Sequence, residues 1–242
     1  MQYAPIRSVY ELSASAGIKV TVYGRSGTGK TTLLSTGPRP FIFSAEKGLL
    51  SLRKVIEERR VSLNNPRYDI PAWVIKGLPD LKQAYAWISQ SKEARQFGCF
   101  GLDSVSEIAE QILEAELKKT ADPRKAYGAI ANEVMGVFRQ FRDLEGPNIV
   151  FLAKEESVKA GISGAVRYYP MFPGQQLTQS TPYMFDELFC LYVGKDGEGK
   201  DIRILRTQPD HEYEAKDRSG RLAPLEWPDL TYIFNKILNR QA

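Results

Sequence analysis

Residues 24–31 read Gly24-Arg25-Ser26-Gly27-Thr28-Gly29-Lys30-Thr31, a complete G-x-x-x-x-G-K-[ST] phosphate-binding loop. A β-branched run at 18–23 precedes it, and Thr32 continues into an expected helix. Strand, loop and helix start place backbone N–H groups and the positive helix end around one anion. Lys30 is expected to reach the β- and γ-phosphates, and the Thr31 hydroxyl to hold Mg²⁺. The stretch predicts a nucleoside triphosphate site formed by Gly24, Arg25, Ser26, Gly27, Thr28, Gly29, Lys30, Thr31 and Thr32.

The composition is ordinary for a soluble globular protein. A length of 242 residues suits a single α/β domain spanning residues 1–242. The net charge of +4 permits nucleic-acid binding without requiring it. Because His211 is the only histidine, neither a zinc enzyme nor a histidine-based triad is expected. Cys99 and Cys190 stand in apolar runs and are interpreted as buried free thiols of a reducing compartment. With no signal core and no membrane-length apolar stretch, the expected location is cytoplasmic.

Short apolar runs alternate with helical patterns, which favours a mostly parallel sheet with crossover helices. Strands are expected at 18–23, 41–45, 72–75, 97–103 and 148–153, and helices around 49–56, 81–88, 104–113, 130–141 and 230–238. Residues 155 to about 180 show no sustained period and are interpreted as a long, structureless functional loop. The runs 187–193 and 202–207 flank a glycine-rich turn and predict antiparallel strands that extend the sheet.

An acidic residue ends the strand expected at 97–103. Asp103 is suited to hold a magnesium-bound water beside Thr31, although it could instead be a plain helix N-cap, a role also open to Ser104. Because serine and not glutamate follows Asp103, a catalytic base must come from elsewhere. Glu46 is the candidate, since it follows the strand at 41–45 and parallel strands deliver their C-terminal ends to one edge. The alternative is a glutamate that merely favours a helix N-terminus.

Other classes of phosphate-loop protein fit less well. The guanine motif Asn-Lys-x-Asp is broken at 235–238, the Asp-x-x-Gly switch is missing after Asp103, and no Leu-Ser-Gly-Gly-Gln transporter signature occurs. Small-molecule kinases usually add an arginine-bearing lid, whereas residues 155–180 contain only Arg167. A small-molecule P-loop kinase stays the alternative from a different class.

Four segments of the chain resemble the RecA-like ATPases. They are the phosphate loop, the stretch Phe43-Ser44-Ala45-Glu46-Lys47-Gly48-Leu49, the triplet Leu102-Asp103-Ser104, and the stretch Glu214-Ala215-Lys216-Asp217-Arg218-Ser219-Gly220. The similarity is greatest to short, core-only versions encoded by bacteriophages, the phage P-loop AAA-domain nucleotide-binding proteins of annealing or recombinase type. It implies a RecA-like P-loop NTPase fold, ATP with Mg²⁺ as the nucleotide, and Glu46 as the residue that activates water.

The resemblance also implies active sites that are shared between subunits. The segment at 214–220 is similar to the Lys-x-Arg-x-Gly motif of RadA and the DnaB-type helicases, whose Lys and Arg, here Lys216 and Arg218, reach a neighbouring subunit's ATP in a homo-oligomeric ring or filament. The chain departs from its relatives at Lys154, which stands where they often carry Gln or His as a γ-phosphate sensor, and we expect this lysine to contact the nucleotide phosphates in their place.

The phage resemblance implies recombination-associated annealing of single-stranded DNA, aided by a single-strand-binding protein, in the cytoplasm of a bacterial host. A helicase or helicase-loader component is the alternative within nucleic-acid work.

Cations interleaved with aromatic residues occur in two stretches that follow strands. Cations contact phosphates and aromatic rings stack on bases, so this composition is typical of single-strand binding, although each stretch alone could be a solvated loop. The expected DNA-contacting residues are Lys118, Lys119, Arg124, Lys125 and Tyr127 in the first stretch, and Lys159, Arg167, Tyr168, Tyr169 and Phe172 in the second.

Overall fold

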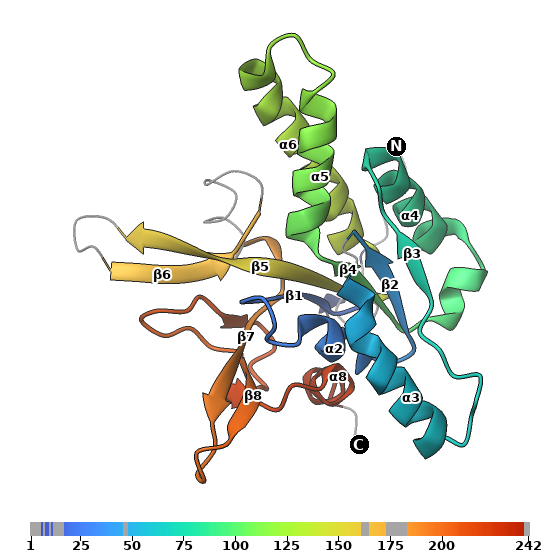
Figure 1. Ribbon diagram of the computed structural model, residues 1–242, viewed down its shortest axis with the longest axis vertical. Coiled ribbons are helices and arrows are strands. Elements are labelled where there is room, and N and C mark those ends of the chain that lie inside the picture. The colour runs from blue at the N-terminus through green and yellow to red at the C-terminus, as the bar shows by residue number, and fades with distance from the viewer. Residues whose placement is uncertain are drawn as a thin grey trace.

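A mixed sheet with helices on both faces organises the computed structural model (Figure 1). The structure describes residues 17–45, 48–160, 165–172 and 183–239 and positions 6, 8, 9 and 11, with the backbone alone at 124, 125 and 160. Glu46 and residues 173–182 therefore lie outside the described residues. Among the described helices, none combines the length and apolarity that crossing a membrane requires.

Ten strands form this sheet within the described residues, in the order β10-β8-β7-β1-β5-β4-β2-β3, with β6 paired to β5 and β9 paired to β7. The strands from β7 to β3 in this order are mutually parallel, whereas β8, β10, β9 and β6 join by antiparallel pairing. Their bounds are β1 Lys19–Gly24, β2 Pro40–Ser44, β3 Ala72–Val74, β4 Cys99–Asp103, β5 Asn148–Ala160, β6 Ala165–Pro170, β7 Glu187–Lys195, β8 Asp201–Arg206, β9 Lys216–Asp217 and β10 Leu225–Glu226.

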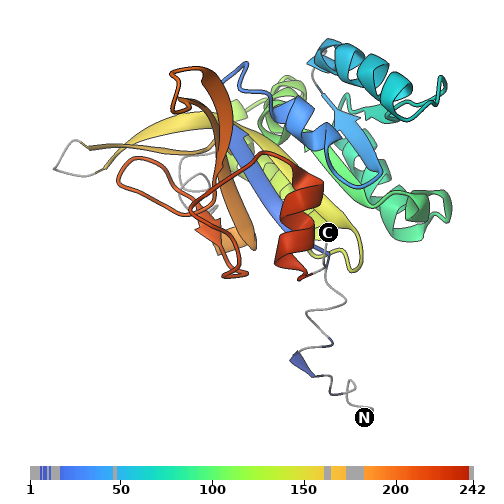
Figure 2. The ribbon, with the colours of Figure 1, turned by 90° about the horizontal axis from the view of Figure 1, so that it is seen from below.

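Apolar residues on the two faces of the sheet build two cores. Helices α4, α5 and α6 pack on one face, and α2, α3 and α8 pack on the other. Figure 2 shows α8, in red, beside the blue strand β1. The helices are α2 Lys30–Ser35, α3 Leu52–Ser62, α4 Leu78–Gln90, α5 Val105–Leu117, α6 Pro123–Arg142 and α8 Leu230–Ile237, with short 3₁₀ segments η1 Gly48–Ser51 and η2 Glu93–Gln96.

The predicted fold class is confirmed in its architecture, a mostly parallel α/β sheet with an antiparallel C-terminal extension. The two cysteines are buried free thiols, as predicted, and burial raises the pKa of each to about 12. The expected crossover helices are also present.

The expectation of a structureless stretch after residue 155 is wrong for the residues that the structure describes. Strand β5 continues through 13 residues to Ala160, and β6 pairs with it antiparallel, from Glu155 opposite Pro170 to Ala160 opposite Ala165. The hairpin projects from the body of the sheet (Figure 1). Its strands are held by backbone pairing rather than by a buried apolar face, so the sequence carries no regular alternation there.

Candidate nucleotide-binding site

The phosphate loop joins β1 to α2 at the C-terminal edge of the parallel strands. Gly27 and Gly29 have φ values of 80° and 98°, in the left-handed region that residues with a Cβ rarely adopt. Gly29 is the N-cap of α2, so the loop turns directly into the helix N-terminus. A glycine-rich turn that leads into a helix N-terminus can stabilise an anion through its backbone N–H groups.

Thr31 and Asp103 meet at the end of the loop. The Thr31 hydroxyl donates to Asp103 Oδ2 at 2.7 Å, and Asp103 is only 5% exposed. The Ser104 hydroxyl accepts from the Glu107 backbone N–H and caps α5, so Asp103 is not the N-cap. A hydroxyl and a carboxylate oxygen are the hard ligands that Mg²⁺ takes, and these two residues fit that ion.

Lys30 lies on the inner side of the loop. Its Nζ donates to the carbonyl oxygens of Gly24 at 2.7 Å and of Arg25 at 3.0 Å, which holds the ammonium group inside the loop. The loop borders a cavity of about 580 Å³. Residues 24–27 and 29–32 line this cavity, together with Ser51, Asp103, Lys154, Glu155 and Arg203. The Thr28 side chain is turned away and donates to the Arg25 carbonyl.

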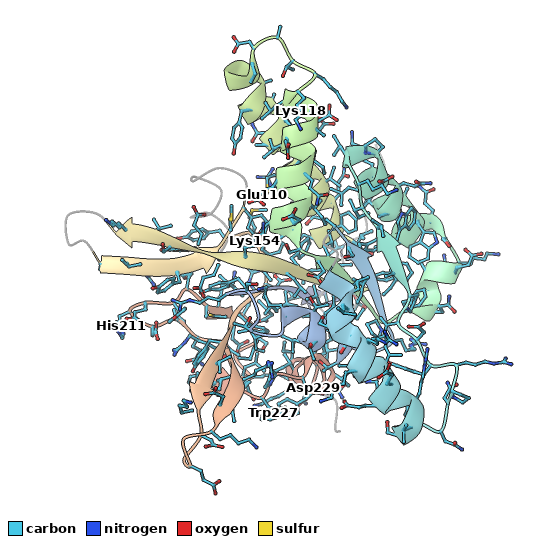
Figure 3. The ribbon with its side chains drawn as sticks, in the orientation of Figure 1. Glu110, Lys118, Lys154, His211, Trp227 and Asp229 are labelled. Carbon is cyan, nitrogen blue, oxygen red and sulfur yellow. The ribbon has the colours of Figure 1, made fainter. Side chains whose placement is uncertain are left out.

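Lys154 lies beside the loop, because β5 pairs with β1 and places it opposite Gly24. Its Nζ contacts Glu107 Oε2 at 2.7 Å and Glu110 Oε2 at 2.6 Å, both on α5 (Figure 3). Burial lowers the pKa of Lys154, but hydrogen bonds to these two carboxylates outweigh it and raise the pKa above its ordinary value. Hydrogen bonds from Lys154 and Gln111 lower the pKa of Glu107. Lys154 is therefore ion-paired with two carboxylates of α5.

Three residues of the cavity wall were missed by the sequence reasoning: Ser51, Glu155 and Arg203. Glu155 accepts from Arg25 Nε at 3.1 Å. Glu155 directly follows Lys154, and this position could have indicated a site residue only if β5 had been predicted to continue past Ala153. Neither Ser51 nor Arg203 stands in a motif or a periodic pattern, so the sequence offered no signal for them.

Glu46 itself lies outside the described residues, but its preceding neighbour is placed. The Ala45 N–H donates to the Asp103 carbonyl at 3.0 Å, and Gln111 Nε2 donates to the Ala45 carbonyl at 3.1 Å. The chain therefore leaves β2 at the same edge of the sheet as Asp103, which ends the neighbouring strand β4.

Lys216 and Arg218 lie outside the lining of this cavity. Lys216 is in β9, opposite Leu188 of β7, and its ammonium donates to the Phe185 carbonyl. Burial lowers the pKa of Lys216. Arg218 pairs with Asp186 and remains largely exposed.

The first stretch expected to contact DNA lies at the end of α5 and the start of α6, a helical arm that extends beyond the sheet (Figures 1 and 3). Lys118 and Lys119 are exposed and pair with Glu114 and Glu116. Tyr127 is 40% exposed. For Arg124 and Lys125 the structure describes the backbone alone.

The second stretch lies on the β5–β6 hairpin and the residues after it. Lys159 is exposed, whereas Arg167 pairs with Glu214 at 3.1 Å and lies over the Tyr169 ring. Tyr168 stacks on Tyr213, with ring centroids 4.9 Å apart.

Phe172 is 3% exposed and packs against Phe138 and Phe185 in the core. The expectation that Phe172 stacks on a base is therefore wrong, because a core position excludes the ligand. Lys118, in the first stretch, stands at the end of α5 away from Lys154 (Figure 3).

A glycine-rich loop between a buried strand and a helix, with a threonine–aspartate contact at its end, defines the class of P-loop NTPases. Residues 16–219 match the family described as AAA domain, and the chain belongs to this family. No curated protein matches the chain.

Three solved structures are similar in fold over most of the chain. The RadB recombinase is 14% identical, with 81% of this chain and 85% of that chain covered and a TM-score of 0.46. The flagellar accessory protein FlaH from Methanocaldococcus jannaschii is 10% identical, with 83% and 80% covered and a TM-score of 0.43. A KaiC-like protein from Pyrococcus horikoshii is 12% identical, with 79% and 78% covered and a TM-score of 0.40. At these values the likenesses carry no conclusion about function.

Proposed function

We propose that the protein is a RecA-like, magnesium-dependent ATPase that binds single-stranded DNA. The observation that carries the ATPase part is the 2.7 Å contact from Thr31 to Asp103, directly beside Lys30 and the glycine-rich loop. This contact supports the proposal, because a hydroxyl and a carboxylate oxygen beside a glycine-rich loop are the kind of ligands that Mg²⁺ takes next to phosphate groups.

Each residue of the site has a proposed task. Mg²⁺, held through Thr31 and Asp103, would neutralise charge on the β- and γ-phosphates. Lys30 contacts the same phosphates from inside the loop. Glu46 accepts the proton of the attacking water as general base. Lys154 contacts the γ-phosphate when the nucleotide competes with Glu107 and Glu110 for its ammonium group.

The DNA part of the proposal rests on exposed cations and aromatic rings outside the nucleotide cavity. Lys118, Lys119 and Tyr127 on the arm and Lys159 on the β5–β6 hairpin are exposed, as phosphate and base contacts must be. Tyr169, partly exposed on the same hairpin, is a further stacking candidate. Arg167 and Tyr168 would have to leave Glu214 and Tyr213 in order to contact DNA.

Assembly and biological setting belong to the same proposal. The protein is proposed to form a ring or filament in which Lys216 and Arg218 contact the ATP of a neighbouring subunit. Both cations lie on a segment outside their own subunit's cavity, which supports a role in trans. The proposed process is annealing during phage recombination in the host cytoplasm, with a single-strand-binding protein as partner.

The test is ATP hydrolysis by the purified protein with Mg²⁺, with and without single-stranded DNA. We expect turnover that DNA stimulates and that Lys30→Ala abolishes, with Lys92→Ala as the control because Lys92 is an exposed cation far from the loop. Turnover that DNA does not alter would contradict the DNA part. Phosphate transfer to a small-molecule acceptor instead of water would favour the alternative of a small-molecule P-loop kinase.

A further inference from the structure

Arg203 closes the nucleotide cavity on the side of the antiparallel extension. It stands on β8, opposite Val193 of β7, and lines the cavity. Its Nε donates to the Thr28 carbonyl oxygen at 2.8 Å, so the side chain is anchored directly to the phosphate loop. The remaining guanidinium N–H groups contact no acceptor among the residues that the structure describes.

The loop is shaped to accept this guanidinium group. A Cβ atom built on Gly29 would lie 2.7 Å from Arg203 Nε and 3.2 Å from its Cδ. Glycine at position 29 therefore serves both the left-handed φ and the close approach of an arginine to the backbone. The guanidinium group therefore packs against Gly29, the loop residue from which α2 begins.

The charges around the cavity distinguish Arg203 from its neighbours. Arg25 is paired with Glu155, and Lys154 is paired with Glu107 and Glu110. For Arg203, no carboxylate lies within ion-pair distance in the described part of the chain. A guanidinium group that is exposed, fixed at Nε and open at its remaining donors can bind an anion with little loss of side-chain entropy.

The sheet order shows which end of the nucleotide Arg203 would meet. Asp103 and Lys154 lie on β4 and β5, on one side of β1, whereas Arg203 lies on β8, on the opposite side. The metal-binding oxygens define where the β- and γ-phosphates lie, so the nucleoside end of the ligand points toward β8.

We propose that Arg203 donates hydrogen bonds to oxygens of the α-phosphate, the phosphate group nearest the nucleoside. This inference rests on the proposed ATP-binding function and adds a residue to that site. It makes the antiparallel extension part of the nucleotide site, whereas Lys154 on the other side senses the γ-phosphate.

The test is calorimetric titration of the full-length protein with Mg-ATP and Mg-ADP at low and high salt. The variants are Arg203→Gln and Arg203→Lys, with Lys200→Gln as a matched control that removes a cation from the same hairpin outside the cavity. We expect Arg203→Gln to weaken ATP and ADP by the same factor, about tenfold, because both nucleotides carry the α-phosphate. The salt dependence of both affinities should also decrease. Arg203→Lys should retain part of the affinity, and Lys154→Gln should weaken ATP more than ADP.

Several results would overturn the inference. Unchanged affinity in Arg203→Gln shows that the residue does not touch nucleotide. Weaker binding with an unchanged salt dependence and a lower melting temperature of the ligand-free protein shows that Arg203 only braces the loop. Loss of ATP affinity alone places Arg203 at the γ-phosphate. Failure of the proposed function is distinct, because then the wild-type protein binds neither nucleotide.

Discussion

Asp103 and Ser104 have different roles in the structure, one as partner of Thr31 and the other as N-cap of α5, and the sequence alone did not assign them. Either side chain could cap α5, and the sequence contains no feature that decides between them. The structure gives the cap to Ser104, whose hydroxyl accepts from Glu107 N–H, and leaves Asp103 to accept from Thr31. The pairing of β4 with β5 brings Asp103 level with Leu152, close to the loop strand. The contact of Asp103 with Thr31 therefore depends on how the strands pair, which the periodicity of the sequence does not reveal.

The proposed base can be tested at a single residue. Glu46→Gln is expected to retain ATP affinity and to lower turnover roughly 10²-fold or more, because the amide cannot accept a proton. Steady-state hydrolysis and nucleotide titration measure the two effects separately. Glu57→Gln on the exposed face of α3 is the control. Normal turnover in Glu46→Gln would assign the base to another carboxylate.

Glu187 is a buried carboxylate that holds the segment carrying Lys216 and Arg218. It accepts from the backbone N–H groups of Arg218 and Ser219, both at 3.2 Å. Burial raises the pKa of Glu187 from 4.5 to about 8, and nearby Asp217 adds to the shift. Folding therefore favours its protonated form.

This shift predicts how stability depends on pH. The stabilising contribution of protonated Glu187 is complete below pH 4.5 and is lost as pH rises toward 8. Urea unfolding at pH 5.5, 6.5 and 7.5 should show the wild-type free energy of unfolding falling relative to Glu187→Gln, by an amount on the order of a few kcal/mol. Burial lowers the pKa of Lys19 to about 8, so this residue makes the free energy of unfolding rise with pH, but only above pH 8. Parallel curves for the two proteins would show that Glu187 does not titrate on unfolding.

At the scale of elements, the β5–β6 hairpin shows where the sequence was uninformative. The buried half of β5 was predicted because its residues are uniformly apolar. Its outer half is polar, and it is held by pairing with β6 and by contacts such as the stacking of Tyr168 on Tyr213. Such contacts join residues distant in sequence and leave no local period. Arg203 escaped prediction for the same reason, since only the β7–β8 hairpin brings it to the loop.

The β5–β6 hairpin and the residues after it include both an exposed residue, Lys159, and a core residue, Phe172. Lys159→Gln is expected to weaken single-strand binding and to reduce the log-salt slope by about 0.7, because one phosphate contact is lost. Phe172→Ala is expected instead to lower the free energy of unfolding by roughly 3–5 kcal/mol, since it empties a core position. Fluorescence titration with labelled oligonucleotide and urea unfolding measure these effects, with Lys195→Gln as an exposed control. An unaltered slope in Lys159→Gln would remove this hairpin from the DNA surface.

At the scale of the whole molecule, the nucleotide cavity and the β9 segment occupy different parts of the sheet. The cavity lies where β1 and β4 end and beside Lys154 in the middle of β5, whereas β9 pairs with the first residues of β7. Because β7 runs parallel to β1, those first residues lie toward the opposite end of the sheet from the loop. Lys216 and Arg218 are therefore unlike the other cations of the proposed site, and in the proposed oligomer their target is the ATP of a neighbouring subunit.

Mixing two defective proteins tests that arrangement. Lys30→Ala lacks the phosphate contact, Arg218→Ala lacks the proposed contact in trans, and each is expected to be nearly inactive alone. Mixed oligomers should recover part of the ATPase activity, because some interfaces combine an intact loop from one subunit with an intact Arg218 from its neighbour. Hydrolysis is measured across mixing ratios, and co-assembly is checked by light scattering and by retention of one variant on the other's affinity tag. If co-assembled mixtures recover no activity, Arg218 serves only its own subunit through its pairing with Asp186.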